Sequence, residues 1–450
     1  MWAVSAIHDF PGLRGGGGQP FTGFVDALLR AQCFVHGLPD SAIATTLRVN
    51  VRDGGVDTRI DKGSPQDATG RLRCPSAWQF KAESIDRVTE GSVVKEIQNH
   101  YATDLVLKGY GYRVCVCDEM TAERKGLLEK ALNAAAQAIR QDAEPCFVLS
   151  ASDLAEWANR FPGIVATQFD RPTTIARHWQ AWQVSEIALT PSYVLPPDWK
   201  DQFAAIQSHL RFPAVPFDPV LPVQGAAGVG KTRLVFEAIN QLPGAEQLVV
   251  LTDDDERAIE VARWLVNVGR SAILVADECS ARGRFEVAKI VRGHEARIRV
   301  IAIDNTGELP PHGAPGIWLE KINVSIAEKI LAQNYPAVSI ERRRAYASLS
   351  GGYIRLAADL CRHDPQMSSA SGLAPAIPPL QDYYLRRIPE NDQRIVEAVS
   401  LVHRIGHSDD VASDLNLLSA LTGVEPAKVR ETASRLKDAP GFVAVTPRYF

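Results

Sequence analysis

The chain has 450 residues, of which 46% are hydrophobic and 23% are charged, and its formal net charge is −4. This length exceeds one ordinary core and predicts roughly three globular domains. The slightly negative charge excludes a basic field over the whole chain of the kind that attracts nucleic acid, although a basic groove within one domain would not show in the total.

We expect a cytoplasmic protein without membrane contact. The first ten residues lack the basic region and long apolar core of a signal peptide, and no apolar run approaches the ~18 residues of a membrane span. The seven cysteines form an odd and scattered set, which is typical of reduced thiols. Cys115 and Cys117 lie in an apolar run with no further metal ligand nearby, so we interpret them as buried thiols.

An α/β domain is predicted over residues 1–165. The first 20 residues are expected to form a loop, because the glycine run at 15–18 favours a flexible connector. Apolar periodicity and turn residues define the remaining elements of this domain. Helices are expected at 21–35, near 91–101, at 121–140 and from Ser152 onward, and strands at 44–51, 56–60, 77–82, 103–107, 111–117 and 146–150.

Further segments make the chain an α/β multidomain protein. Residues 166–215 are rich in Trp and Pro and predict a structured linker, in which Trp179 and Trp182 are expected to pack between domains rather than to stack on bases. Apolar runs at 219–224, 247–251, 272–276 and 299–303 predict a parallel sheet that is buried on both faces. We expect this sheet to form one domain at 216–310, followed by a helical region at 311–379 and a further domain at 380–450.

A phosphate-binding loop is the most specific motif of the chain. Residues 225–232 read GAAGVGKT, which matches the P-loop pattern G-x-x-x-x-G-K-[ST], with an apolar run before it and a helical pattern after it. Glycines let the backbone surround phosphates, and the helix N-terminus favours an anion. We predict that Lys231 binds the β- and γ-phosphates of ATP and that Thr232 ligates Mg²⁺. The predicted cofactor-binding residues of the loop are Gly225, Gly228, Gly230, Lys231 and Thr232.

Two acidic residues end the third apolar run of this domain, about 45 residues after the P-loop. We predict that Asp277 ligates Mg²⁺ and that Glu278 acts as the general base or positions the attacking water. At the end of the next run, Asn305 or Thr306 could sense the γ-phosphate, with an ordinary turn as the alternative. A Gly-Gly turn before Arg355 could aim that guanidinium at the nucleotide, with a surface position as the alternative.

These motifs resemble the STAND branch of the AAA-type ATPases over about residues 216–450. The resemblance rests on the P-loop, the Asp-Glu strand end, the polar strand, a Gly-Gly-x-x-Arg lid and a helix–turn–helix pattern within 414–436. It implies a nucleotide switch that drives homo-oligomerisation. It also implies a P-loop NTPase core at 216–310, a helical lid at 311–379 and a winged-helix domain at 380–450, with residues 442–447 as its wing. We interpret this module as structural, with DNA reading by its second helix as the alternative.

A second pattern with chemistry lies in the N-terminal domain. Gln79 and Lys81 alternate with Trp78 and Phe80, so on a strand the polar pair faces one side and the apolar pair the other. Asp57 on the adjoining strand would complete a cluster. Its carboxylate and the Gln79 amide oxygen suit Mg²⁺, and the Lys81 ammonium suits the charge of a phosphodiester transition state. The alternative is an amphipathic sheet with a solvated face.

This pattern resembles the PD-(D/E)xK restriction-endonuclease fold, in the Mrr-like variant in which Gln replaces Glu. The resemblance covers about residues 20–165 and rests on Gly-Gly-Val-Asp at 54–57 and Trp-Gln-Phe-Lys at 78–81. Asp26, on the first predicted helix, falls where such enzymes often carry an acidic residue. The resemblance implies a restriction-endonuclease-like domain that cuts DNA with Asp57, Gln79 and Lys81, of which Asp57 and Gln79 hold the metal.

Together the two resemblances imply a bacterial antiviral defence protein. The expected activity is a nucleotide-switched DNA endonuclease that hydrolyses ATP with Mg²⁺, responds to a trigger such as a phage protein, and oligomerises on activation. The alternative is a nucleotide-dependent signalling scaffold whose N-terminal domain binds nucleic acid without cutting it. A remodelling motor is a third hypothesis. It requires an arginine finger, for which the candidates are Arg282, Arg284 and Arg292.

Overall fold

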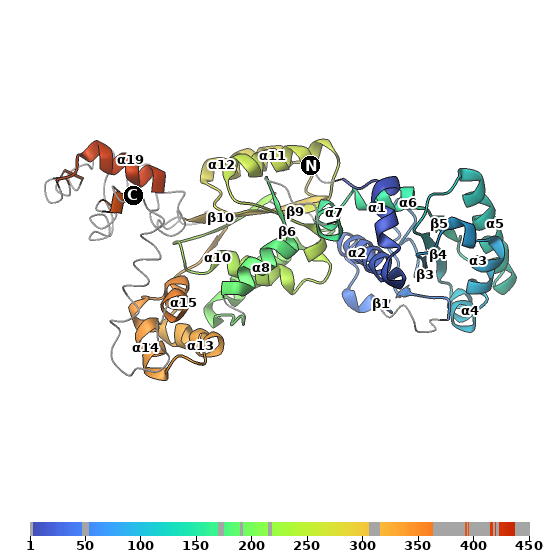
Figure 1. The fold of residues 1–450 in the computed structure, drawn as a ribbon, viewed down its shortest axis with the longest axis horizontal. Coiled ribbons are helices and arrows are strands. Elements are labelled where there is room, and N and C mark those ends of the chain that lie inside the picture. The colour runs from blue at the N-terminus through green and yellow to red at the C-terminus, as the bar shows by residue number, and fades with distance from the viewer. Residues whose placement is uncertain are drawn as a thin grey trace.

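The computed structural model describes residues 3–46, 54–169, 175–189, 192–214, 218–305 and 316–362, together with 392, 393, 395, 415, 416, 419 and 423–436. Its helices pack around two separate β-sheets (Figure 1). The expectation of an α/β protein is therefore confirmed. Among the described residues, none of the helices is both long and apolar enough to cross a lipid bilayer.

The N-terminal sheet is mixed. Its strands, in their order across the sheet, are β1 (Ile43–Thr45), β2 (Thr58–Ile60), β3 (Ser76–Lys81), β4 (Gly111–Val116) and β5 (Phe147–Leu149). β2 pairs antiparallel with β1 and β3, whereas β3, β4 and β5 run parallel. Alternation along β3 places Trp78 and Phe80 in one core and Ala77 in the other, so both faces of the sheet are covered.

Helices cover both faces of this sheet. They are α1 (Ala6–Leu13), α2 (Gln19–Val35), α3 (Glu90–Ile97), α4 (His100–Leu107), α5 (Ala122–Ile139), α6 (Ala151–Ala158) and α7 (Pro162–Gln168). α2 packs on the face of Trp78 and Phe80, while α3 and α5 pack on the face of Val114 and Val116. The core on the Trp78 and Phe80 face is continuous with the core around the second sheet, whereas the core on the other face contains residues of the N-terminal domain only.

Two elements of this domain differ from the sequence-based expectation. The predicted strand at 103–107 is wrong, because Ala102 and Leu105 are buried at helical spacing and the segment forms α4. The predicted loop over the first 20 residues is wrong in part, because α1 forms there and buries Phe10. The Phe10 ring lies edge-on to Phe24 of α2, with their centroids 5.5 Å apart. In both segments, packing of apolar side chains in the core therefore determines that the chain is helical.

The second sheet carries the P-loop. Its strands, in their order across the sheet, are β11 (Ile317–Trp318), β7 (Val220–Gly225), β10 (Ile298–Asn305), β9 (Ala272–Ala276), β8 (Val249–Thr252) and β6 (Arg177–His178). All neighbours run parallel except β6, which is antiparallel to β8. β10 therefore lies between β7 and β9, and the carboxyl ends of all three strands meet at one edge, where ligands of such sheets collect.

Helices also cover both faces of the second sheet. They are α8 (Trp179–Leu189), α9 (Lys200–Leu210), α10 (Lys231–Asn240), α11 (Asp255–Asn267) and α12 (Ala281–Val291). Figure 1 shows α8 and α10 on one side of the strands and α11 and α12 on the other. Three helices follow in the region where a helical lid was predicted, and we call them the lid helices: α13 (Val324–Asn334), α14 (Ile340–Leu349) and α15 (Ile354–Arg362).

Parts of the C-terminal expectation fall outside the described residues. α19 (Pro426–Leu436) lies where the second helix of the winged-helix module was predicted. The expected wing at 442–447 and the candidate sensor Thr306 lie outside the described residues. The winged helix therefore stays a prediction.

The segment expected as a linker packs on the P-loop domain. β6 extends the second sheet, and α8 contacts α10. Trp179 stacks on the Phe236 ring of α10, with centroids 4.6 Å apart and planes at 4°, and Trp182 meets the same ring edge-on at 5.3 Å. Both tryptophans are buried, so they serve packing.

The two α/β domains share a packed boundary. The short helix η5 (Ala245–Leu248), which follows α10, contacts α2 and α7 of the N-terminal domain. Figure 1 shows α2 and α7 between the two sheets. The Ser271 N–H also donates a 2.8 Å hydrogen bond to the Arg160 carbonyl oxygen across this boundary. The helix that begins at the P-loop thus leads directly to the N-terminal domain.

Candidate functional site

The P-loop joins β7 to α10 at the carboxyl edge of the parallel sheet. Gly225, Gly228 and Gly230 have φ values of +148°, +79° and +114°, which L side chains rarely adopt. These turns lead the backbone around the N-terminus of α10, which begins at Lys231. Loop N–H groups and the helix dipole together favour a bound phosphate at this point.

Lys231 is folded into the loop. Its Nζ donates to the carbonyl oxygens of Gly225 at 2.9 Å and of Ala226 at 2.8 Å, and only 4% of the residue is exposed. Burial lowers the pKa of Lys231 to about 8, while three nearby carboxylates oppose the shift. The ammonium contacts neutral carbonyl groups, and a phosphate would supply a negative partner in their place.

Thr232 and Asp277 lie together although 45 residues separate them in the chain. The Thr232 hydroxyl donates to Oδ2 of Asp277 at 3.2 Å, and the Glu278 N–H donates to Oδ1 at 3.0 Å. Burial raises the pKa of Asp277, and these two hydrogen bonds and Lys231 oppose the shift. A hydroxyl oxygen and a carboxylate are the protein ligands that Mg²⁺ takes beside substrate phosphates, so the donor set fits this ion.

A tight turn holds Glu278 beside Asp277. Among the described residues, Glu278 is the only residue other than glycine with a positive φ, which is +52°. Such strain, typically ~1–3 kcal/mol, persists where surrounding contacts fix the backbone. Here the Cys279 N–H donates to the Ile303 carbonyl oxygen and the Ser280 N–H to Oδ1 of Asp255, each at 2.8 Å. The turn therefore projects an exposed carboxylate at the edge where the P-loop lies.

β10 brings its last two residues next to the P-loop. In the register of β10 and β7, Asp304 lies opposite Gln224 and Asn305 opposite Gly225. Burial raises the pKa of Asp304, and Arg284, with Nη1 3.8 Å from Oδ2 of Asp304, opposes the shift. Asn305 thus ends its strand where a sensor of the γ-phosphate would act, and that role stays a prediction.

The start of α15 docks on the P-loop. The Arg355 N–H donates to the Gly228 carbonyl oxygen at 3.1 Å, and the Ile322 N–H donates to the Gly352 carbonyl oxygen at 3.3 Å. The first bond ties the start of α15 to the loop, and the second ties the Gly-Gly turn to the segment before α13. The Arg355 side chain is exposed, and its contact with a nucleotide stays a prediction.

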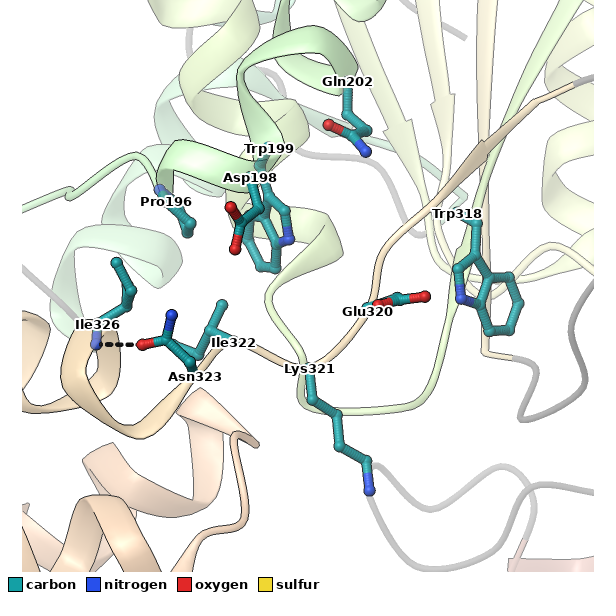
Figure 2. A pocket seen from close by; sticks show the side chains of 10 residues that line it. All are labelled: Pro196, Asp198, Trp199, Gln202, Trp318, Glu320, Lys321, Ile322, Asn323 and Ile326. Carbon is teal, nitrogen blue, oxygen red and sulfur yellow. Dashed lines mark hydrogen bonds between the residues drawn. The ribbon is translucent and has the colours of Figure 1, made fainter.

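A cavity of about 170 Å³ lies between the linker segment and the start of the lid. Trp199 joins it to the P-loop, because a Cβ built on Gly230 would lie 3.4 Å from the Trp199 ring. Figure 2 shows Asp198 and Trp199 on one side and the Glu320 carboxylate extending toward the Trp318 ring on the other. The cavity thus combines aromatic faces with acidic acceptors directly beside the phosphate loop.

In the N-terminal domain, Asp57 lies directly before β2 and next to β3. Its N–H donates to the Trp78 carbonyl oxygen at 2.8 Å. Its carboxylate Oδ2 accepts a 2.6 Å hydrogen bond from the Phe80 N–H. The structure therefore brings Asp57 next to the peptide that joins Gln79 to Phe80.

Gln79 and Lys81 lie on the face of β3 that α3 covers, opposite Val114 and Val116 of β4. Gln79 is 6% exposed, and its Oε1 has no hydrogen-bond partner among the described residues. An unsatisfied buried amide oxygen of this kind costs ~1–3 kcal/mol, so it marks a place for a ligand or a water. The Lys81 Nζ lies 2.5 Å from Oε1 of Glu96 on α3.

Asp26 lies on the other side of the same sheet. It accepts hydrogen bonds from Arg30 Nε at 2.8 Å and from the Thr45 hydroxyl at 2.6 Å. Thr45 pairs with Thr58, and Thr58 shares the face that α2 covers. The structure therefore separates Asp26 from Gln79, which faces α3.

Neither candidate metal site is a cluster of classical metal ligands. Within the described residues, no group of three or more His, Cys, Asp or Glu side chains is arranged to hold a metal ion. The two candidate Mg²⁺ sites therefore rest on mixed oxygen donors, namely Thr232 with Asp277 and Asp57 with Gln79.

Neither a protein-family model nor a curated protein matches the sequence. Among solved structures, a signal transduction ATPase with numerous domains (STAND) protein with a tetratricopeptide repeat sensor from Pyrococcus horikoshii matches with a TM-score of 0.27 and 13% identity, over 57% of this chain and 41% of that one. The Hsp104:casein complex of S. cerevisiae in its extended conformation matches with a TM-score of 0.30 and 14% identity, over 60% and 53%. Both are similar at a distance, and scores this low support neither a fold nor a function. The case for a nucleotide site therefore rests on the geometry of the P-loop and its neighbours.

Sequence reasoning missed three parts of these sites. Glu96 gave no signal, because its contact with Lys81 joins a helix to a strand 15 residues away. Asp304 could have been found, since it precedes Asn305 at the end of an apolar strand. Trp199 and Trp318 flank the P-loop domain, and only the folded chain brings them to one cavity.

Proposed function

We propose that the chain binds and hydrolyses ATP at the P-loop. The observation that carries this proposal is the hydrogen bond between Thr232 and Asp277 at the end of the loop. In one place it joins a helix N-terminus, a buried lysine and the oxygen donors for Mg²⁺. A strand end does not need these groups in order to fold, so we attribute their arrangement to ligand binding.

Each residue of the site would have its own role in phosphoryl transfer. Lys231 would exchange its two carbonyl partners for phosphate oxygens. Thr232 and Asp277 would hold Mg²⁺, which when bound neutralises phosphate charge. Glu278 would orient the attacking water and accept its proton. Asn305 and Arg355, which lie next to the loop, would contact the γ-phosphate.

The cavity beside the loop supports a nucleotide rather than free phosphate as the ligand. Trp318, which is half-buried, offers a face for stacking on a base, and the buried Trp199 ring forms part of the cavity wall. The carboxylates of Asp198 and Glu320 can accept hydrogen bonds from an exocyclic amino group, which adenine carries. We therefore infer that the base lies in this cavity while the phosphates lie on the loop.

ATP turnover by the full chain tests this site. We expect Lys231→Ala to abolish turnover, whereas Lys289→Ala, which removes an exposed lysine from α12, should leave it unchanged. Unchanged turnover and ATP affinity in Lys231→Ala would refute the assignment. A melting curve of each variant separates loss of the site from loss of the fold.

We further propose that the N-terminal domain is a Mg²⁺-dependent DNA endonuclease. Its support is the position of Asp57 beside Gln79, the orphaned amide oxygen of Gln79, and the ammonium of Lys81 on the same face of β3. Asp57 and Gln79 would hold the metal, and Lys81 would stabilise negative charge on the scissile phosphate. The contact between η5 and α2 supports a nucleotide switch for this activity.

The resemblance of both domains to bacterial defence proteins suggests antiphage defence as the setting. In that setting a trigger, for example a phage protein, would act through the ATPase and drive homo-oligomerisation. The alternative is a nucleotide-dependent scaffold that binds nucleic acid without cutting it. One observation favours this alternative: the Lys81 ammonium, which cleavage would need, is paired with the Glu96 carboxylate.

Incubation with duplex DNA, Mg²⁺ and ATP separates the two functions. The endonuclease proposal expects cleavage by the wild-type chain and none by Asp57→Ala or Lys81→Ala. DNA binding without cleavage under every condition, including with candidate triggers, would favour the scaffold. Cleavage that persists in both variants would point to a contaminating nuclease.

A further inference from the structure

We propose that Glu96 is the second carboxylate ligand of a divalent-cation site that it forms with Asp57 and Gln79. The inference rests on the proposed endonuclease site and adds to it a residue from α3. Neither the strand pattern nor its resemblance to known nucleases points to Glu96. The reason to look for such a residue is electrostatic, since Gln79 is neutral and Asp57 alone would face both a divalent cation and the Lys81 ammonium.

The buried oxygen of Gln79 shows where a cation would be accepted. The Gln79 residue is buried, with 6% of its surface exposed, and its Oε1 has no hydrogen-bond partner among the described residues. Amide oxygens are good ligands of hard cations such as Mg²⁺ and Mn²⁺. The neighbouring carboxylate of Asp57 is held by the Phe80 N–H at 2.6 Å, so its orientation relative to Gln79 is fixed.

Glu96 reaches the same face of β3 from α3. Its Oε1 lies 2.5 Å from the Nζ of Lys81, two residues after Gln79, and its Oε2 accepts from the Asn99 Nδ2 at 3.0 Å. Each carboxylate oxygen can accept more than one contact. Glu96 can therefore hold Lys81 and ligate a cation with the same group.

The backbone fixes Glu96 relative to Asp57. Gly55, two residues before Asp57, packs so closely on α3 that a Cβ there would lie 2.3 Å from the Glu96 carbonyl oxygen. The Tyr112 hydroxyl donates to the Gly55 carbonyl oxygen at 2.5 Å and holds the same turn from β4. The loop that carries one carboxylate and the helix that carries the other are thus docked on each other.

The competing interpretation is that Glu96 only neutralises Lys81. The two interpretations differ in the affinity for metal, which a simple counter-ion would not increase. Mn²⁺ binding to the nucleotide-free full chain, measured by electron paramagnetic resonance, tells them apart. Asp277→Asn is introduced throughout, so that the P-loop site does not contribute to the signal.

We expect Glu96→Gln and Asp57→Asn each to weaken Mn²⁺ binding roughly tenfold or more, as loss of a ligand does. Glu90→Gln, which changes an exposed glutamate at the start of the same helix, should bind Mn²⁺ as the parent does. Glu96→Asp, which keeps the carboxylate, should bind more tightly than Glu96→Gln. Melting curves check that each variant is folded.

Unchanged Mn²⁺ affinity in Glu96→Gln would overturn the proposal, and so would a parent chain that binds no Mn²⁺. DNA cleavage is measured separately, in chains that keep Asp277 and with Mg²⁺, ATP and candidate triggers, and it distinguishes this failure from failure of the endonuclease. Cleavage that needs Asp57 but not Glu96 would refute Glu96 as a ligand and leave the endonuclease standing. Mn²⁺ binding that needs both carboxylates, with no cleavage, would establish the metal site and refute the endonuclease.

Discussion

The Thr232 hydroxyl donates a hydrogen bond to the Asp277 carboxylate at 3.2 Å, from the first turn of α10 to the end of β9. β10 lies between β7, which leads into the P-loop and α10, and β9, which Asp277 follows, so the contact forms only because three strands end at one edge of the sheet. This relationship places the two proposed Mg²⁺ ligands beside the P-loop.

The first prediction concerns Mg²⁺ at this pair. Thr232→Val removes the hydroxyl while it keeps the shape of the side chain, so the ion loses one ligand. We expect ATP binding to weaken roughly tenfold with Mg²⁺ and to change little with EDTA. Isothermal titration with and without Mg²⁺ measures both affinities. Equal weakening in both conditions would show that Thr232 acts in folding rather than on the metal.

The second prediction concerns Glu278 as the group that activates water. Glu278→Gln keeps size and hydrogen bonding but cannot accept a proton, so turnover should fall about 10²–10⁴-fold while ATP affinity is retained. Both residue types tolerate the positive φ similarly, so stability should change little. Glu260→Gln on α11 is the matched control, since its side chain is exposed. Wild-type turnover in Glu278→Gln would assign the base elsewhere.

The third prediction concerns the proton of Lys231. Burial lowers its pKa to about 8 in the nucleotide-free chain, and phosphate contact favours the charged form. ATP binding at pH 8 should therefore take up about half a proton, and affinity should fall as pH rises through 8. Titration calorimetry in buffers of different ionisation enthalpy measures the uptake. Identical heats in all buffers at pH 8 would contradict the lowered pKa.

The fourth prediction concerns the boundary between the two domains. Gly244 has a φ of +90°, and a Cβ there would lie 2.7 Å from the Arg30 carbonyl oxygen of α2. Gly269 has a φ of +72° but meets only an Arg297 side-chain nitrogen, at 3.5 Å. Gly269→Ala should cost ~1–2 kcal/mol for its left-handed backbone, and Gly244→Ala should cost more because α2 must move.

Amide hydrogen exchange localises this effect. Gly244→Ala should reduce protection in α2 and η5, whereas Gly269→Ala should reduce it only near its own turn. Equal protection of α2 in the two variants would show that the boundary is not a packed contact in solution.

The fifth prediction concerns the cavity beside the P-loop. If the base stacks there, Trp318→Ala should weaken ATP binding by ~1–3 kcal/mol and leave inorganic tripolyphosphate unaffected. Trp264→Ala on α11 is the control, because Trp264 is also half-buried and does not line this cavity. Parallel loss of both ligands would mean that Trp318 supports the loop rather than the base.

Much of the fold followed from local patterns in the sequence. The buried strands of the second sheet read as continuous apolar runs, and β9 matches its predicted bounds of 272–276. The lid helices fall within the region predicted as helical. Boundaries that depend on caps were less certain: α6 begins after Ser150, whose hydroxyl accepts from the Asp153 N–H, and not at Ser152.

Contacts between distant segments could not be predicted in the same way. The run at 103–107 has a strand-like composition, and only its burial against α5 and β4 makes it a helix. Asp26 matches an acidic position by sequence order, yet the pairing of β1 with β2 puts it on the face opposite Gln79. Glu96 could be identified as a candidate site residue only from its contact with Lys81 in the folded chain.

We propose that ATP bound at Lys231 controls DNA cleavage at Asp57. The decisive measurement is duplex-DNA cleavage by the wild type, Asp57→Ala and Lys231→Ala, each with Mg²⁺ and with or without ATP. We predict cleavage by the wild type that depends on ATP, and its loss in both variants although Lys231 lies outside the proposed cleavage site. Cleavage by Lys231→Ala at the wild-type rate, or no cleavage by the wild type under any condition, would refute this control.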